Sequence, residues 1–61
     1  MTWTTIKEDG CTVCRSGEYE IVQNYEVGWQ LNWQGRAVNK LEPIKSLRVA
    51  KEEAEEHARF N

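Results

Sequence analysis

The stretch GWQLNWQG, residues 28–35, decides the fold of this chain because its apolar and polar residues alternate strictly. Trp29, Leu31 and Trp33 fall on one side of an extended backbone, and the intervening amides fall on the other. Period two is typical of a strand with one buried face. The stretch therefore predicts a half-buried strand, with a glycine at each end where the chain can turn into a neighbouring strand.

The segments on either side of this strand read as its partners. The preceding EYEIVQNY, residues 18–25, is rich in strand-forming residues. One side of it carries Tyr19, Ile21, Gln23 and Tyr25. Gly28 can adopt the positive φ that a short hairpin loop requires. Beyond Gly35, the segment RAVNKL at 36–41 predicts a third strand paired with the tryptophan strand.

The first part of the chain adds a further hairpin. TWTTIK at 2–7 and CTVCR at 11–15 are short β-prone runs, and EDG separates them. Asp-Gly is a common hairpin turn. We expect these runs to form a first hairpin or an irregular edge of the sheet.

The last part of the chain predicts a helix. Pro43 has no N–H for a strand ladder and should end the third strand. Ser46 is a good N-cap for SLRVAKEEAEEHARF, residues 46–60, which is helical by composition. One narrow stripe of this helix carries Leu47, Ala50, Ala54 and Ala58. Such small residues let a helix lie close to a sheet, so that the large tryptophans fill the remaining gap.

Together these segments predict one α+β domain over residues 1–61: an antiparallel meander of three to five strands with one C-terminal helix packed on one face. A chain this short buries only about 60% of its unfolded surface. Its stability is therefore small, and self-association as a homodimer would hide further surface. The sequence has no secretory signal and no apolar run of about 18 residues, so we expect a cytoplasmic protein with no membrane partner and reduced cysteines.

Cys11 and Cys14 form a C-x-x-C motif that can indicate a metal site or a redox pair. Zinc needs four ligands, and this chain offers the two thiols with His57 as a third. In an extended strand, a spacing of three sends the two side chains to opposite faces with Cα atoms about 10 Å apart. We expect one buried thiol and one surface thiol, with no metal and no cofactor.

Two polar clusters are candidate contacts for a protein partner. The amides Gln30, Asn32 and Gln34 form a row opposite the tryptophans, and an uncharged row can bond a partner at little desolvation cost. The helix carries an acidic band made of Glu52, Glu53, Glu55 and Glu56, which can dock on a basic surface or imitate nucleic-acid phosphate. Its candidate contact residues are Glu52, Glu53 and Glu56. A solvated sheet face and a solvated helix face are the alternatives.

Nucleic acid is the second candidate partner. The net charge is −2, but residues 36–51 alone carry five basic side chains and one acidic side chain. These basic side chains can contact phosphates: Arg36, Lys40, Lys45, Arg48 and Lys51. They are spread over strand, loop and helix without interleaved aromatic residues, and specific nucleic-acid readers are usually basic overall. We therefore expect a protein partner before a nucleic acid.

The sequence offers no catalytic group in a credible arrangement, and we expect no enzyme. His57 lies near the predicted helix C-terminus, where a cationic or hydrogen-bonding side chain can stabilise the exposed carbonyls. We therefore interpret it as structural. Val49 and Phe60 project away from the alanine stripe and can add apolar contact with a partner, although Phe60 can also fold back on the helix end.

The pattern SGEYEIVQ (16–23), GWQLNWQGRAV (28–38) and SLRVAKEEAEEHA (46–58) resembles a class of very small α+β proteins encoded by phages and prophages. This resemblance implies a protein of the host cytoplasm that binds, and inhibits or redirects, a host or defence component. The order of strands and helix is also similar to the arm-binding N-terminal domain of tyrosine recombinases, which implies DNA binding.

Overall fold

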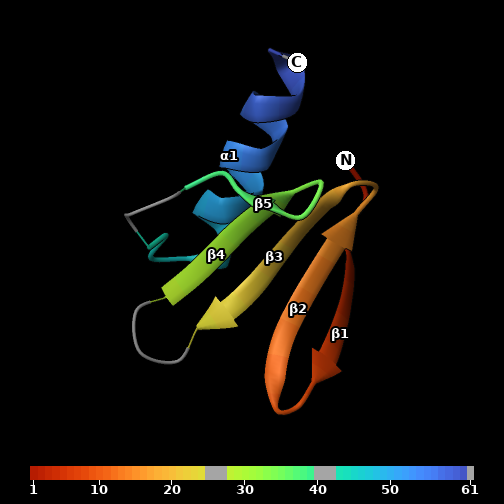
Figure 1. Ribbon diagram of the computed structural model, residues 1–61, viewed down its shortest axis with the longest axis vertical. Helices are drawn as coiled ribbons and strands as arrows, with labels where there is room; N and C mark the ends of the chain where they lie inside the picture. Colours follow the sequence, from red (N-terminus) through yellow and green to blue (C-terminus); the bar gives the residue numbers. More distant parts are fainter. Residues whose placement is uncertain (25–27, 40–42, 61) are drawn as a thin grey trace.

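The computed structural model describes residues 1–24, 28–39 and 43–60. Its elements are β1 (Thr4–Glu8), β2 (Cys11–Ser16), β3 (Tyr19–Asn24), β4 (Gly28–Trp33), β5 (Arg36–Ala37) and α1 (Leu47–Arg59). The strands form one antiparallel sheet in sequence order, as Figure 1 shows. The predicted α+β meander with a C-terminal helix is confirmed. Three predicted features lie outside the described residues, namely Tyr25, Lys40 and the end of the RAVNKL segment.

At two tight turns between these strands, the backbone angles match the residues at the tip. Asp9 and Gly10 have φ of 51° and 82°, and Gln34 and Gly35 have φ of 52° and 79°. Positive φ at both central residues is the pattern of a type I′ hairpin, whose twist suits antiparallel strands. The Asp-Gly turn therefore forms the predicted first hairpin.

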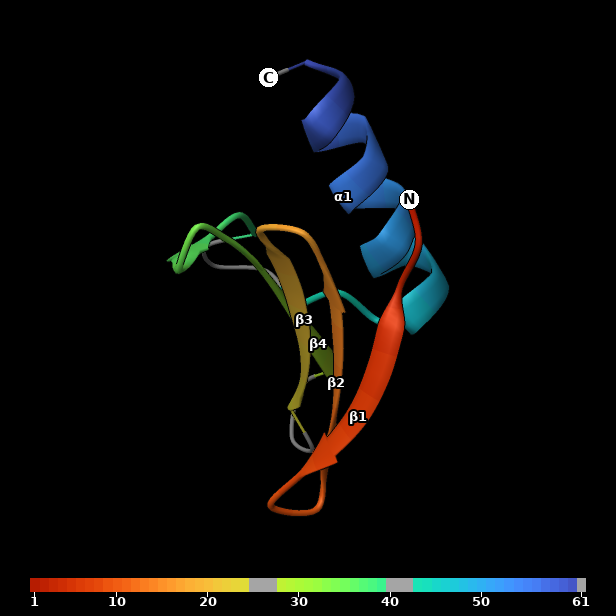
Figure 2. The same ribbon diagram turned by 90° about the vertical axis from the view of Figure 1, so that its right-hand side faces the viewer.

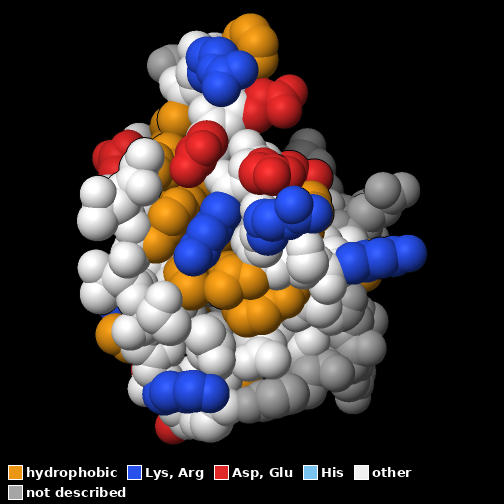
Figure 3. All heavy atoms as spheres, turned by 180° about the vertical axis from the view of Figure 1, so that it is seen from behind, with side chains coloured by type: hydrophobic (Ala, Val, Ile, Leu, Met, Phe, Trp, Pro, Cys, Tyr) orange, Lys and Arg blue, Asp and Glu red, His pale blue; other side chains and the backbone are white. Residues whose placement is uncertain are grey.

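The helix covers one face of the sheet and leaves the other face open, as Figure 2 shows from the side. Ser46 caps the helix as predicted, since its Oγ accepts a hydrogen bond of 3.2 Å from the Val49 N–H. Figure 3 shows the face that bears the helix, where hydrophobic side chains remain visible beside it. One helix is therefore too narrow to cover the whole apolar face of the sheet.

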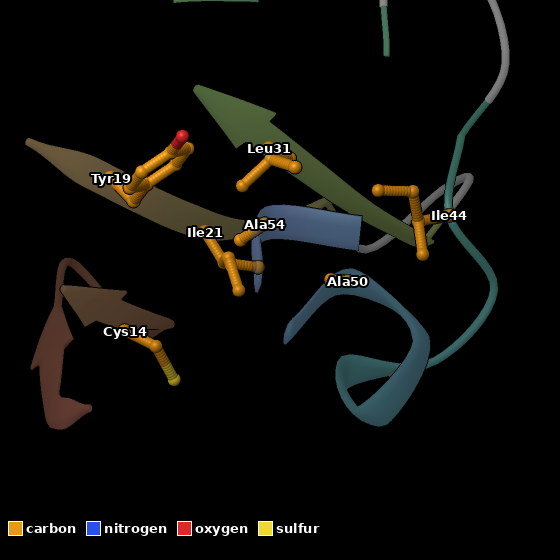
Figure 4. Close-up of a cluster of buried hydrophobic side chains, with 7 residues drawn as sticks. All are labelled: Cys14, Tyr19, Ile21, Leu31, Ile44, Ala50 and Ala54. Atoms are coloured by element: carbon orange, nitrogen blue, oxygen red, sulfur yellow. The ribbon is translucent and has the colours of Figure 1, made fainter. Parts of the chain in front are cut away.

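The centre of the core consists of small and aliphatic residues, drawn in Figure 4. Cys14, Ile21 and Leu31 are fully buried, and Ala50 and Ala54 of the helix are 0% exposed against them. The three tryptophans pack around this cluster and are only partly buried: Trp3, Trp29 and Trp33. The tryptophans pack against the cluster that contains the two alanines, but the indoles form the margin of the core.

The predicted helix stripe was wrong at its last member, because Ala58 is exposed. The final turns of the helix extend past the end of the sheet in both ribbon views, in agreement with the exposure of Ala58. His57, which neighbours Ala54 on the helix surface, makes the last contact with the sheet instead.

The third strand of the predicted meander was too long. Among the residues of this segment that the structure describes, 36–39, only Arg36 and Ala37 pair as β5 with the end of β4. The Val38 N–H still donates to the Leu31 carbonyl over 2.8 Å, but the Leu31 N–H donates to Asn39 Oδ1 over 3.0 Å. A side-chain carbonyl thus takes the place of the backbone acceptor, and the regular ladder ends there.

Ile44 covers the rest of the β4 edge, which the sequence analysis did not anticipate. The Trp29 N–H donates to the Ile44 carbonyl over 2.7 Å, and the Ile44 N–H donates to the Trp29 carbonyl over 3.0 Å. Gly28 makes this approach feasible, because a Cβ at that position would lie 2.4 Å from the Ile44 oxygen. The outer edge of β4 is therefore shielded by the chain itself, which is one way to prevent edge-to-edge pairing.

Candidate functional site

The helix end is fixed to the sheet by three rings. Tyr19 on β3 and Trp33 on β4 are opposite each other in the sheet, and His57 of α1 packs on both. The Trp33 and His57 rings are 5.0 Å apart between centroids, and Tyr19 meets His57 edge-on at 5.6 Å. Tyr19 Oη lies 2.6 Å from His57 Nδ1. The sequence placed His57 at the helix C-terminus, but it did not predict this contact of the ring with Tyr19 and Trp33 of the sheet.

The chemistry of this aromatic cluster is suited to anchoring the helix end on the sheet. Burial, with a smaller contribution from the Glu18 charge, raises the pKa of the Tyr19 hydroxyl above its ordinary value. The phenol therefore stays protonated at neutral pH, and its oxygen is hydrogen-bonded to the Nδ1 atom of His57. A buried, protonated phenol is a poor base, and its hydrogen bond holds the last turns of the helix in place.

A shallow depression of about 410 Å³ opens beside this cluster. Its lining comes from the end of the sheet and from the outer helix turns: Val38, Glu53, Glu56, His57 and Phe60. Phe60 is 77% exposed, although its backbone N–H donates to the His57 carbonyl over 3.3 Å and so continues the helix end. We call this surface the helix-end depression. It combines apolar side chains with two carboxylates.

The predicted acidic band divides around the helix. Glu53 and Glu56 line the helix-end depression, whereas Glu52 and Glu55 do not. All four are exposed. Because a helix turns 100° per residue, positions 53, 56, 57 and 60 follow one side of it, and the other two glutamates follow another side.

The predicted amide row is incomplete. Gln30 and Asn32 lie on the sheet face opposite the helix, and Gln30 Nε2 donates to Asn32 Oδ1 over 3.2 Å. Gln34 lies in the β4–β5 turn, where its side chain donates to Glu18 over 2.9 Å. The left-handed turn conformation removes Gln34 from the strand alternation. The amides and the acidic band are therefore on different faces of the molecule, and they do not form one site.

The open face of the sheet is covered in part by its own charges. Val13 lies on this face, yet it is only 4% exposed. Arg15 bonds Glu20 over 2.9 Å and Glu8 over 3.2 Å along the same face. The hydrogen bond with Glu20 is the main cause that raises the pKa of the Arg15 guanidinium. This ion-paired surface has less apolar area to offer a partner than alternation alone suggests.

The predicted phosphate contacts do not converge on one described surface. Arg36 is exposed on β5, Lys45 follows the Ile44 bridge, and Arg48 and Lys51 lie one turn apart on the helix. Lys40 is outside the described residues. Figure 3 shows basic and acidic side chains side by side over the helix. This mixture weakens the positive field that attracts a nucleic acid.

The two cysteines occupy opposite faces of β2, as their spacing predicts. Cys14 is fully buried in the core and Cys11 is half-buried; both are free thiols. Within residues 1–24, 28–39 and 43–60, no group of three or more His, Cys, Asp or Glu side chains could hold a metal ion.

No family model, curated protein or solved structure matches this chain. In the part of the chain that the structure describes, no helix has the length and apolar character needed to cross a lipid bilayer. The geometry of the described surfaces is therefore the basis for the functional argument.

Val38 was not among the residues predicted to contact a partner; it is half-buried against the core and also lines the helix-end depression. Phe60, for which two positions were left open, is exposed. The sequence does contain a pattern that places part of this lining together, since residues 53, 56, 57 and 60 recur at helical spacing. Val49, which was expected to face a partner, instead packs partly buried against the core. Only the structure shows that β5 ends where Val38 can face this side of the helix.

Proposed function

We propose that this chain is a small non-enzymatic interaction protein that binds a protein partner at the helix-end depression. The observation that carries the proposal is the exposure of Phe60, 77%, beside a hollow that contains two carboxylates. An exposed aromatic side chain next to a polar rim is typical of protein-binding surfaces. The resemblance to small phage proteins suggests a host or defence component as the partner, with inhibition as the outcome of binding.

The arrangement of the lining supports binding rather than catalysis. The carboxylates of Glu53 and Glu56 are exposed, and His57 is engaged with Tyr19. A catalytic carboxylate usually owes its activity to burial or to a close charged partner, which shift its pKa. A binding surface needs only complementary shape and charge.

The test compares variants of the full chain as bait in extract from cells of the organism that encodes it. Phe60→Ala and the double variant Glu53→Gln/Glu56→Gln should lose a protein that the parent chain recovers. The matched control, Glu52→Gln/Glu55→Gln, removes the same charge from the same helix and should retain that protein. Recovery that is equal for all baits, or a recovered protein lost only in the control, would refute the proposal.

The nucleic-acid alternative has its own outcome in this test. Arg48→Gln/Lys51→Gln should leave protein recovery unchanged. Tight binding of duplex DNA that this variant abolishes, and that weakens steeply with salt, would replace protein binding as the function.

A further inference from the structure

We propose, on the basis of the proposed function, that the occupant of the helix-end depression is a basic-apolar peptide segment of the partner. In this arrangement an apolar side chain contacts Val38 and Phe60, and flanking Lys or Arg side chains pair with Glu53 and Glu56. The partner is thereby defined by chemistry: a large aliphatic or aromatic residue between cationic residues.

The apolar part of the inference follows from the exposure of Phe60. A phenyl ring that is 77% exposed can transfer most of its surface from water to a partner. Val38, which follows β5 and is half-buried against the core, adds apolar area to the lining of the depression. A volume of about 410 Å³ that is open to one side suits side chains from an extended segment better than an enclosed small molecule.

The charge part follows from the lining of the depression. Its charged side chains are the carboxylates of Glu53 and Glu56, three residues apart on the helix. Glu52 and Glu55 lie on the same helix and add to the negative field, while Arg59 lies close along the chain and opposes it. A cationic segment is therefore attracted, and an acidic segment is repelled.

The walls of the depression are held before a ligand arrives. His57 lines it and is bonded to Tyr19 over 2.6 Å, while its ring packs on Trp33. This contact fixes the helix turn that presents the two glutamates and Phe60. A preformed surface loses less conformational entropy on binding than a mobile one.

The experiment maps backbone amide shifts of the full chain by NMR during titration with three capped peptides. The first peptide is Lys-Arg-Leu-Phe-Arg-Lys; the second has Glu at every basic position; the third keeps the basic residues and has Ser in place of Leu and Phe. The first should shift the amides of the depression residues in a saturable manner. The second should cause no shift there, and the third should bind at least tenfold more weakly because it buries no apolar side chain.

Variants then test the contacts. Glu53→Gln/Glu56→Gln should weaken binding of the first peptide by about fivefold or more, since each exposed ion pair contributes modestly. Phe60→Ala should weaken it by about tenfold, and folding is not at risk because the ring is mostly exposed. Glu52→Gln/Glu55→Gln should change the affinity less than twofold, as expected for a pair outside the depression.

The outcomes separate this inference from the proposed function. Equal binding of the three peptides, shifts located elsewhere, or no binding of the first peptide would overturn the basic-apolar occupant. In each of these cases, a protein still recovered in a Phe60-dependent manner leaves the interaction function standing with an occupant of different chemistry. The proposed function would be overturned if the parent chain recovered no protein, or if Phe60→Ala recovered the same protein equally well.

Discussion

Gly28→Ala is expected to cause a loss of stability much larger than a surface glycine substitution normally does. Gly28 has φ of 123°, a conformation that alanine rarely adopts, and its added Cβ would lie 2.4 Å from the Ile44 carbonyl oxygen. The clashing atom is backbone, so the segment containing Ile44 has to move. That movement breaks the two hydrogen bonds that join Trp29 to Ile44.

The magnitude follows from these two effects. An unfavourable backbone conformation costs about 1–3 kcal/mol, and each lost hydrogen bond costs about 1 kcal/mol. The free energy of unfolding should therefore fall by about 3–5 kcal/mol. A domain of 61 residues has only about 3–9 kcal/mol in total, so the variant should lose about half of its stability or unfold.

Gly17→Ala is the matched control. Gly17 also has positive φ, 59°, but nothing lies within 4 Å of its added Cβ. It should cost only about 1–2 kcal/mol. Urea unfolding followed by tryptophan fluorescence gives both values, and amide exchange at Trp29 and Ile44 reports on the bridge itself. Equal losses for the two variants would refute the claim that Ile44 covers the β4 edge.

Four further outcomes are expected. Ala54→Leu should lower the free energy of unfolding by about 1–3 kcal/mol because it overfills the core. The matched variant Ala58→Leu, at an exposed position, should change it little. Equal melting temperatures for the two variants would contradict the placement of the helix on the sheet. Tyr19→Phe should lower the free energy of unfolding by about 1 kcal/mol, because the hydrogen bond between the phenol and His57 Nδ1 is lost. Urea unfolding measures this, and an unchanged free energy of unfolding would show that the hydrogen bond does not stabilise the helix end. The contribution of Tyr19 to stability should be constant below pH 10.0, the ordinary pKa of tyrosine, and should fall as the pH rises through the raised pKa of Tyr19, because the unfolded chain releases that proton first. The difference in thermal melting between the parent chain and Tyr19→Phe isolates this contribution, and a difference that begins to shrink below pH 10.0 would contradict it. A thiol reagent should modify Cys11 in the folded chain and Cys14 only on unfolding, and simultaneous labelling in native buffer would place Cys14 outside the core.

The regular elements were predictable because each has a local cause. Alternation in residues 28–35 defined β4, Asp-Gly defined the first hairpin, and Ser46 defined the start of the helix. The opposite faces of Cys11 and Cys14 followed from strand geometry alone. Each of these features depends on residues within a few positions of one another.

The edge of the sheet and the helix-end depression were not predictable, since they depend on contacts distant in sequence. Nothing near Asn39 indicates that its side chain accepts from Leu31, and nothing near Ile44 indicates its bridge to Trp29. The bond between Tyr19 and His57 joins residues 38 positions apart. The acidic band was visible in the sequence, but its division depends on where the helix meets the sheet.

The most direct measurement of the binding claim is photo-crosslinking from two positions of the full chain. A benzophenone amino acid in place of Phe60 samples the helix-end depression, and the same amino acid in place of Asn32 samples the open sheet face. In extract from the encoding organism, the first should give a discrete protein adduct that excess unmodified chain suppresses, and the second should not. A suppressible adduct from the Asn32 position alone would contradict the account, because it would place the partner on the opposite side of the sheet.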